Sequence, residues 1–127
     1  MQILERGMPL IILHCMRKET WETIKDKSVF GGESIDAEGF IHCSSIEYFW
    51  RVTPNFRDIV KELVLLCIDT KKLTSPVKWE DGDNSGREYP HIYGLINLDA
   101  VVAILPYLKG KDGNYIKNKE FAHIPNR

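Results

Sequence analysis

Apolar residues gather in short runs along the chain, and in two of these runs the hydrophobic side chains follow one another without interruption. One run extends from Pro9 to His14 and the other from Glu62 to Ile68. Successive side chains of a strand point to opposite faces, so a continuous apolar run is typical of a strand covered on both sides. We therefore expect these two segments to be core strands of a sheet.

Other patterns predict helices. Trp21 and Ile24 have helical spacing, which predicts an amphipathic helix over 18–27. The segment 44–47, Ser-Ser-Ile-Glu, has the form of a capping box, so we expect a second helix that ends near Val52, before a proline. The Gly31-Gly32 pair breaks the chain, and a loop is predicted through Gly39.

Further short strands complete an α+β pattern. We expect them at 40–43, 77–80, 91–93, 99–104 and 115–121. A length of 127 residues fits one domain, which we place at 9–127, behind a flexible N-terminal extension at 1–8.

Composition excludes several classes of protein. Seventeen basic residues against eighteen acidic ones leave no basic excess for nucleic-acid binding. No apolar run is long enough for a membrane span, and the N-terminus lacks a signal-peptide core, so a cytoplasmic location is expected. Three cysteines without a CxxC motif indicate reduced thiols.

Histidines stand near the ends of three predicted strands, at His14, His42 and His91. By strand alternation, Ser44 shares a face with His42, and Tyr93 shares a face with His91. Imidazoles and hydroxyls over an apolar floor are the composition of a small-ligand pocket. The alternative is that each histidine is an ordinary core residue with a buried hydrogen-bond partner.

Other chemistry has less support. The pairs His14-Cys15 and His42-Cys43 point to opposite faces of their strands, so no metal site and no Cys43 nucleophile is predicted. Cys67 lies in an apolar run, which makes a thiol inert. Ser44 is better explained as a helix cap than as a nucleophile, and no glycine-rich phosphate loop is present.

Carboxylates that could orient an imidazole are Glu38, before the His42 strand, and Glu80 and Glu88, on either side of the loop before His91. Each of them is alternatively a solvated loop charge. We include Glu38 and Arg87 among the candidate ligand-binding residues.

Six blocks in this order resemble a family of small bacterial domains known only as domain of unknown function 952. They are IILH (11–14), AEGFIHCS (37–44), ELVLLCID (62–69), VKWE (77–80), YPHIYG (89–94) and LDAVV (98–102). The resemblance covers roughly Met8 to Leu108, and the EGFIHCS and PHIYG blocks are specific together.

The family looks like a compact relative of the ADP-ribosyltransferase fold. The resemblance therefore implies a split, mixed β-sheet with two or three flanking helices and NAD in the cleft between the sheets. His14 matches the first-strand position that holds a ribose, and His42 with Ser44 lies in the second block. His91 and Tyr93 lie in the third block, and His91 stands where the transferases usually have a glutamate, a departure that argues against transferase activity.

Three functional hypotheses follow. The first is an enzyme that cleaves the nicotinamide bond of NAD or processes a related ADP-ribose nucleotide, in the manner of a transferase or an NAD glycohydrolase. His91 and His42 are its catalytic candidates, His14, Ser44 and Tyr93 bind ligand, and no cofactor is required beyond NAD as substrate. The second is a non-catalytic small-ligand module. The third is a protein-interaction domain anchored by tryptophans, which we weight least because all three tryptophans fit core positions. The sequence leaves the oligomeric state open.

Overall fold

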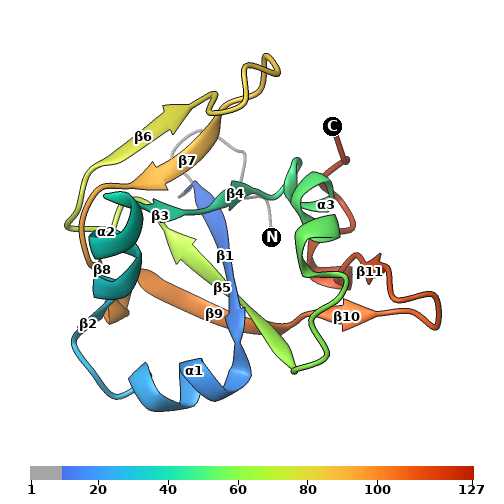
Figure 1. Ribbon diagram of the computed structural model, residues 1–127, viewed down its shortest axis with the longest axis horizontal. Helices are drawn as coiled ribbons and strands as arrows, with labels where there is room; N and C mark the ends of the chain where they lie inside the picture. The colour runs from blue at the N-terminus through green and yellow to red at the C-terminus, as the bar shows by residue number, and fades with distance from the viewer. Residues whose placement is uncertain (1–9) are drawn as a thin grey trace.

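The two longest strands, β1 (Ile11–Arg17) and β5 (Leu63–Asp69), pair antiparallel at the centre of a four-stranded sheet (Figure 1). In this computed structural model, which describes residues 10–127, β4 (Ser44–Ser45) pairs with β1, and β9 (Val101–Pro106) pairs with β5. Both predicted core strands are confirmed. The predicted extension at residues 1–8 lies outside the described residues.

Apolar side chains cover both faces of this sheet. All seven residues of β5 are buried, and the first six alternate between two apolar clusters. Leu65 packs in one cluster with Phe49, whereas Leu66 packs in the other with Ile92. The uninterrupted hydrophobic run is therefore explained by burial on both sides.

A separate three-stranded sheet has the order β3-β7-β6. Its strands are β3 (Ile41–His42), β6 (Val77–Glu80) and β7 (Tyr89–Ile92). Two smaller ladders join β2 (Val29–Phe30) to β8 (Ile96–Asn97), and β10 (Leu108–Lys109) to β11 (Tyr115–Ile116).

Every strand pairing within residues 10–127 is antiparallel. The predicted mixed sheet would contain parallel strand pairs. The described residues contain none, because each strand runs opposite to its neighbours. The coarser prediction, an α+β protein whose strands divide into more than one sheet, is confirmed.

One short segment connects the two larger sheets. Ile41 and His42 pair with β7, and three residues after Ile41 the chain pairs with β1, where Ser44 lies opposite Leu13. The Cys43 amide, between these two pairings, donates to the Pro90 carbonyl at 3.0 Å. β4 pairs with β1 only opposite Ile12 and Leu13, so the later part of β1 has no strand partner on that side among the described residues. The two sheets diverge there.

Short helices flank the sheets. They are α1 (Lys18–Ile24), α2 (Gly32–Glu38) and α3 (Phe49–Val52), with 3₁₀ turns η1 (Thr53–Phe56), η2 (Leu98–Ala100) and η3 (Lys119–Phe121). Helix α1 confirms the helix predicted over 18–27, although it ends three residues earlier than predicted. None of the helices in the described range is long and apolar enough to cross a membrane.

The predicted loop before the His42 strand is wrong, because the segment forms α2. Gly31 precedes this helix at φ 108°, where a Cβ would collide with the Ile41 side chain. Gly39 ends the helix at φ 85°, and its amide donates to the Ile35 carbonyl at 2.8 Å. The two glycines mark the boundaries of a helix. Gly39 has the left-handed conformation that is usual at the C-terminal end of a helix.

The predicted capping box is also wrong. Ser44 and Ser45 form β4, and the helix begins only at Phe49. The Ser44 hydroxyl donates to the Ser45 carbonyl at 2.8 Å, and the Ser45 hydroxyl accepts from the Tyr48 amide at 3.3 Å. Pairing with β1 holds the serine backbones extended, so the serine side chains stabilise the turn that leads to the helix.

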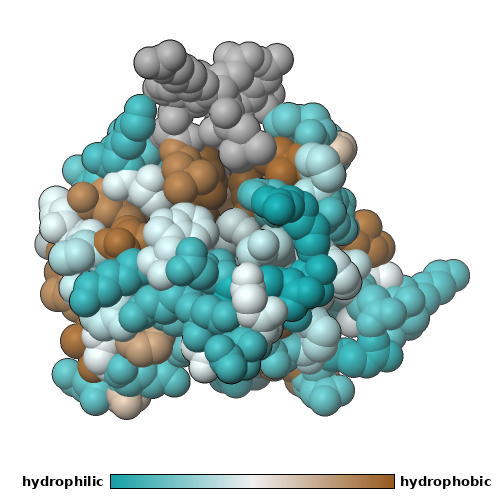
Figure 2. All heavy atoms as spheres, turned by 90° about the horizontal axis from the view of Figure 1, so that it is seen from above, coloured by the Kyte–Doolittle hydropathy of each residue, from teal (hydrophilic) through white to brown (hydrophobic). Residues whose placement is uncertain are grey.

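Two further expectations need correction. The predicted strand at 115–121 is limited to β11, because the segment then turns into η3. Trp50 and Trp79 are exposed on the surface, so a core position is wrong for both of them. Figure 2 shows one face of the molecule, on which hydrophobic residues form separate patches between broad hydrophilic areas.

Candidate functional site

His42 and His91 lie opposite each other on the paired strands β3 and β7, so both side chains project from the same face. Their ring centroids are 5.1 Å apart in an edge-on arrangement. Alternation places Phe40 and Tyr93 on this face as well. The Phe40 ring stacks on His91 at 4.3 Å and lies 5.3 Å from Tyr93. The shared faces predicted for these residues thus meet in one aromatic cluster.

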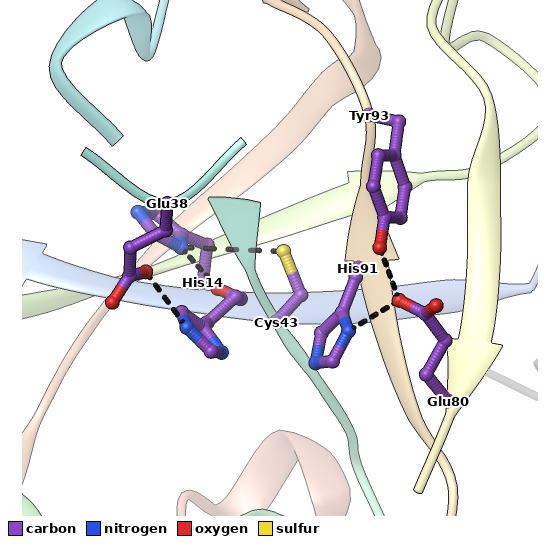
Figure 3. A network of polar contacts seen from close by, with 7 residues as sticks. His14, Glu38, Cys43, Glu80, His91 and Tyr93 are labelled. Atoms are coloured by element: carbon purple, nitrogen blue, oxygen red, sulfur yellow. Dashed lines mark hydrogen bonds and ion pairs between the residues drawn. The ribbon is translucent and has the colours of Figure 1, made fainter. Parts of the chain in front are cut away.

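Glu80 on β6 holds the His91 ring. The Nδ1 atom of His91 lies 2.8 Å from Oε1 of Glu80, and the Tyr93 hydroxyl donates to the same oxygen at 2.6 Å (Figure 3). Tyr93 first, and then His91, lowers the pKa of Glu80 by donating to its carboxylate. Because Nδ1–H of His91 is used in this bond, Nε2 is left with a lone pair for a ligand or a proton.

Glu38, at the end of α2, holds the other ring. Its Oε2 atom lies 2.8 Å from Nε2 of His42. Figure 3 shows the carboxylates of Glu38 and Glu80 on opposite sides of the site. With Nε2–H donating to Glu38, the neutral His42 ring presents Nδ1 as its acceptor, so the two histidines offer different ring nitrogens.

His14 connects the two diverging sheets. Its Nδ1 atom donates to the main-chain carbonyl of His42 at 2.8 Å, and the Cys43 sulfur lies 4.0 Å from the same nitrogen. Burial lowers the pKa of His14, although the bond to the carbonyl acts in the opposite direction. The ring is therefore neutral at physiological pH, with the lone pair on Nε2.

A cleft of about 640 Å³ lies between the two sheets, and we call it the histidine cleft. Its walls contain His14, His42, His91 and Ser44 from the predicted set. The other lining residues are Leu13, Cys15, Phe40, Cys43, Phe49, Val52, Asn55, Phe56, Glu80, Gly82, Asp83 and Tyr89.

The remaining predicted residues lie around this cleft. Glu38 and Tyr93 do not line it, but each bonds to a residue that does. Arg87 lies in the loop between β6 and β7, outside the lining. Glu88 is an exposed residue of the same loop.

Sequence reasoning did not select Phe40, Tyr89 or Asp83 as site residues, and it left Glu80 as one of three alternatives. Strand alternation was a usable signal for the two aromatic residues, since Phe40 shares a strand face with His42, and Tyr89 shares one with His91. Asp83 carried no such signal, because it belongs to an irregular loop.

The three thiols, of which Cys15 and Cys43 line the cleft, are not nucleophiles. Burial raises the pKa of Cys15 and of Cys67 to about 12, and it raises the pKa of Cys43 as well. A thiol in this state is not ionised at neutral pH. Within residues 10–127, no group of three or more His, Cys, Asp or Glu side chains is arranged to hold a metal ion.

The chemistry available is proton transfer and hydrogen bonding. Three imidazoles present free nitrogens, and two of them are oriented by carboxylates, which is a standard arrangement for general acid and base groups. Aromatic walls provide a surface on which a flat ring can stack.

These features define an α+β protein with a cleft between two antiparallel sheets and two histidine–carboxylate pairs. The model of a family described as "Protein of unknown function (DUF952)" matches residues 15–104, and the chain belongs to this family.

Solved structures with the same fold come from Caulobacter crescentus. The crystal structure of protein CC0527 is 24% identical in sequence, with a TM-score of 0.69, over 88% of this chain and 98% of that one. The solution structure of CC0527 is 26% identical at the same TM-score, over 90% of this chain and 96% of that one. No curated protein matches this chain.

Proposed function

We propose that the histidine cleft binds NAD or a related ADP-ribose nucleotide and cleaves its N-glycosidic bond, on a small relative of the ADP-ribosyltransferase fold. The observation that carries the proposal is the pair His42 and His91, whose ring centroids are 5.1 Å apart and each of which bonds to its own carboxylate, with a third imidazole on the same cleft. A volume of about 640 Å³ lies in the range of small-molecule sites. The division of the strands into two sheets supports the proposed relationship.

In the proposed reaction, a water oxygen bonds to the anomeric carbon of the ribose while the bond from that carbon to the nicotinamide nitrogen breaks. The electron pair of the broken bond leaves with nicotinamide. The proton of the attacking water passes to Nε2 of His91, because Nδ1 of that ring is held by Glu80. Glu80 stabilises the imidazolium that forms.

The other two histidines bind and orient. His14 is neutral, and its Nε2 accepts a hydrogen bond from a ribose hydroxyl. His42 is the better candidate for contact with the base, since Tyr93 donates its hydroxyl to Glu80 and does not line the cleft. The Phe40 ring beside His91 adds a stacking surface.

Release of nicotinamide from NAD tests this function. Purified protein is incubated with NAD, and nicotinamide is quantified by chromatography for the wild type, His91→Gln and the control His123→Gln. His123 lies on a separate hollow with Phe121. We expect turnover by the wild type and the control and a loss of about a hundredfold or more in His91→Gln. Turnover that His91→Gln leaves unchanged overturns the catalytic role.

A non-catalytic nucleotide module is the second candidate. It is favoured by the double use of Glu80, whose Oε1 already accepts from Tyr93 and His91 and is not free for a ribose hydroxyl. Saturable binding of NAD without nicotinamide release would select this function over the enzyme.

A further inference from the structure

The histidine cleft has an unusual balance of charge for a nucleotide site. Glu80 and Asp83 line it, whereas no lysine or arginine does so within the described part of the chain. A phosphate placed among these carboxylates would be repelled, and the repulsion is stronger near a protein surface than in free water. The cationic pyridinium ring of NAD suits such a cleft, so the phosphate groups must lie elsewhere.

Basic residues gather near Tyr89, one of the residues that line the cleft. The Tyr89 ring lies 5.6 Å from the Tyr48 ring. The guanidinium carbons of Arg51 and Arg127 each lie 6.0 Å from the centre of the Tyr48 ring. Arg87 precedes Tyr89 by two residues along the chain. Arg51 and Arg127 therefore lie beside the Tyr48 ring, and Arg87 lies two residues before Tyr89; we call these three arginines the arginine rim.

Among residues 10–127, no Asp or Glu side chain forms an ion pair with any of these three guanidinium groups, whereas Arg17 on the far end of β1 pairs with Glu19. The Nε atom of Arg51 donates to the main-chain carbonyl of Arg127 at 2.7 Å, which fixes the Arg51 side chain and leaves its terminal nitrogens to other acceptors.

Charge effects on Tyr89 agree with this placement. Burial raises the pKa of Tyr89, the positive charges of Arg51 and Arg87 act in the opposite direction, and the negative charge of Asp83 has a smaller raising effect. Both arginines are therefore near enough to influence the Tyr89 phenol that lines the cleft.

We propose that the arginine rim, formed by Arg51, Arg87 and Arg127, binds the pyrophosphate of an ADP-ribose nucleotide whose riboside end occupies the histidine cleft. Arginine suits this role because its planar fork donates two parallel hydrogen bonds to a phosphate. The inference deepens the proposed function and rests on it. The cleft receives the cationic nicotinamide ring and its neutral ribose, and the rim receives the anionic pyrophosphate.

Calorimetric titration with two probes tests the rim. ADP-ribose carries the pyrophosphate, whereas nicotinamide riboside lacks it and keeps the cationic ring. The test variant is Arg51→Gln/Arg87→Gln, and the matched control is Arg17→Gln/Lys61→Gln, which removes the same charge from two exposed pairs with Glu19.

We expect the test variant to bind ADP-ribose at least about tenfold more weakly and nicotinamide riboside within about twofold of wild type. The control should bind both probes like the wild type. The salt dependence of ADP-ribose binding should also be smaller in the test variant, since fewer charge contacts remain.

Two further variants guard the interpretation. Arg87→Gln alone leaves the Arg51 bond to the Arg127 carbonyl intact, so this variant should fold even if the double variant does not. Its affinity for ADP-ribose should still be severalfold lower than that of the wild type. Lys27→Gln removes the cation of a neighbouring hollow that also contains His14. A loss of ADP-ribose affinity in Lys27→Gln but not in Arg87→Gln would overturn the rim.

Failure of the arginine rim and failure of the proposed function give different results in these titrations. If the wild type binds ADP-ribose and neither Arg87→Gln nor the double variant weakens it, the rim is wrong and the cleft assignment stands. If the wild type binds neither probe, the proposed function fails and the rim fails with it.

Discussion

The two histidine–carboxylate pairs use the same residue types in different surroundings. His91 is buried, with 9% of its side chain exposed, and Glu80 reaches it from the neighbouring strand. His42 and Glu38 expose 60% and 51% of their side chains, and they are only four residues apart in the chain. The first pair depends on the register of two strands, and the second depends on a short helix and the turn at Gly39.

This contrast separates positioning from contact. A buried imidazole that stacks on Phe40 and is fixed by Glu80 has one orientation, which suits a group that must transfer a proton. An exposed imidazole beside an exposed carboxylate can change rotamer at little cost, which suits a group that contacts ligand. The two pairs should therefore respond differently to mutation.

Truncation of the buried ring should have the largest effect on stability. His91→Ala removes a partner of Glu80, the ring stacked on Phe40 and most of a buried side-chain volume. We expect the free energy of unfolding to fall by about 2 kcal/mol. Urea denaturation checks this value. A loss below about 0.5 kcal/mol would mean that His91 is not structurally fixed as described.

Acid should weaken the protein through His14. Because burial holds its folded pKa below the unfolded value near 6.5, the unfolded chain binds more protons between the two values. Stability is therefore complete above about pH 6.5 and falls as the pH decreases below it, by at most about 1.4 kcal/mol per pH unit for this group. Urea denaturation between pH 7 and 5 measures the slope, and His14→Gln should reduce it. An unchanged slope in that variant would assign the effect to other groups.

The exposed pair should contribute little to stability. We expect His42→Ala and Glu38→Gln to change the free energy of unfolding by less than about 1 kcal/mol, since an exposed ion pair is hydrated in both states. Affinity for NAD should nevertheless decrease in His42→Ala, which titration calorimetry measures. Loss of stability equal to that of His91→Ala would remove the distinction between the pairs.

The smallest expected effect is a change in one titration. Tyr93→Phe removes the hydrogen bond that contributes most to the low pKa of Glu80. The pKa of Glu80 should rise toward its ordinary value, while the bond to His91 keeps it from reaching that value. Carboxyl-carbon NMR across an acid titration records the shift, and a lower pKa in the variant would contradict the described network.

Patterns of period two predicted most of what could be predicted. The apolar runs of β1 and β5 and the shared faces of His42 and His91 follow from alternation along a strand, which the sequence displays directly. The pairing of His42 with His91 was not predictable, because the register between strands separated by almost fifty residues is set by tertiary packing.

The local sequence led to wrong predictions at two places and gave no prediction at a third. Ser44 and Ser45 resemble a helix cap, but pairing with β1 takes their backbones into a strand. Gly31 and Gly39 resemble loop residues, although they bound a helix. Arg51 and Arg127 are 76 residues apart, and nothing in their surroundings along the chain indicates that both pack on Tyr48.

Ring resonances of the histidines test the central claim most directly. The chain has four histidines, of which His14, His42 and His91 line the histidine cleft and His123 lies on a separate hollow. We predict that titration with NAD shifts the imidazole signals of the first three with one common dissociation constant and leaves His123 unmoved. Signals of all four rings that stay unchanged at millimolar NAD, or a shift confined to His123, would contradict a nucleotide site in this cleft.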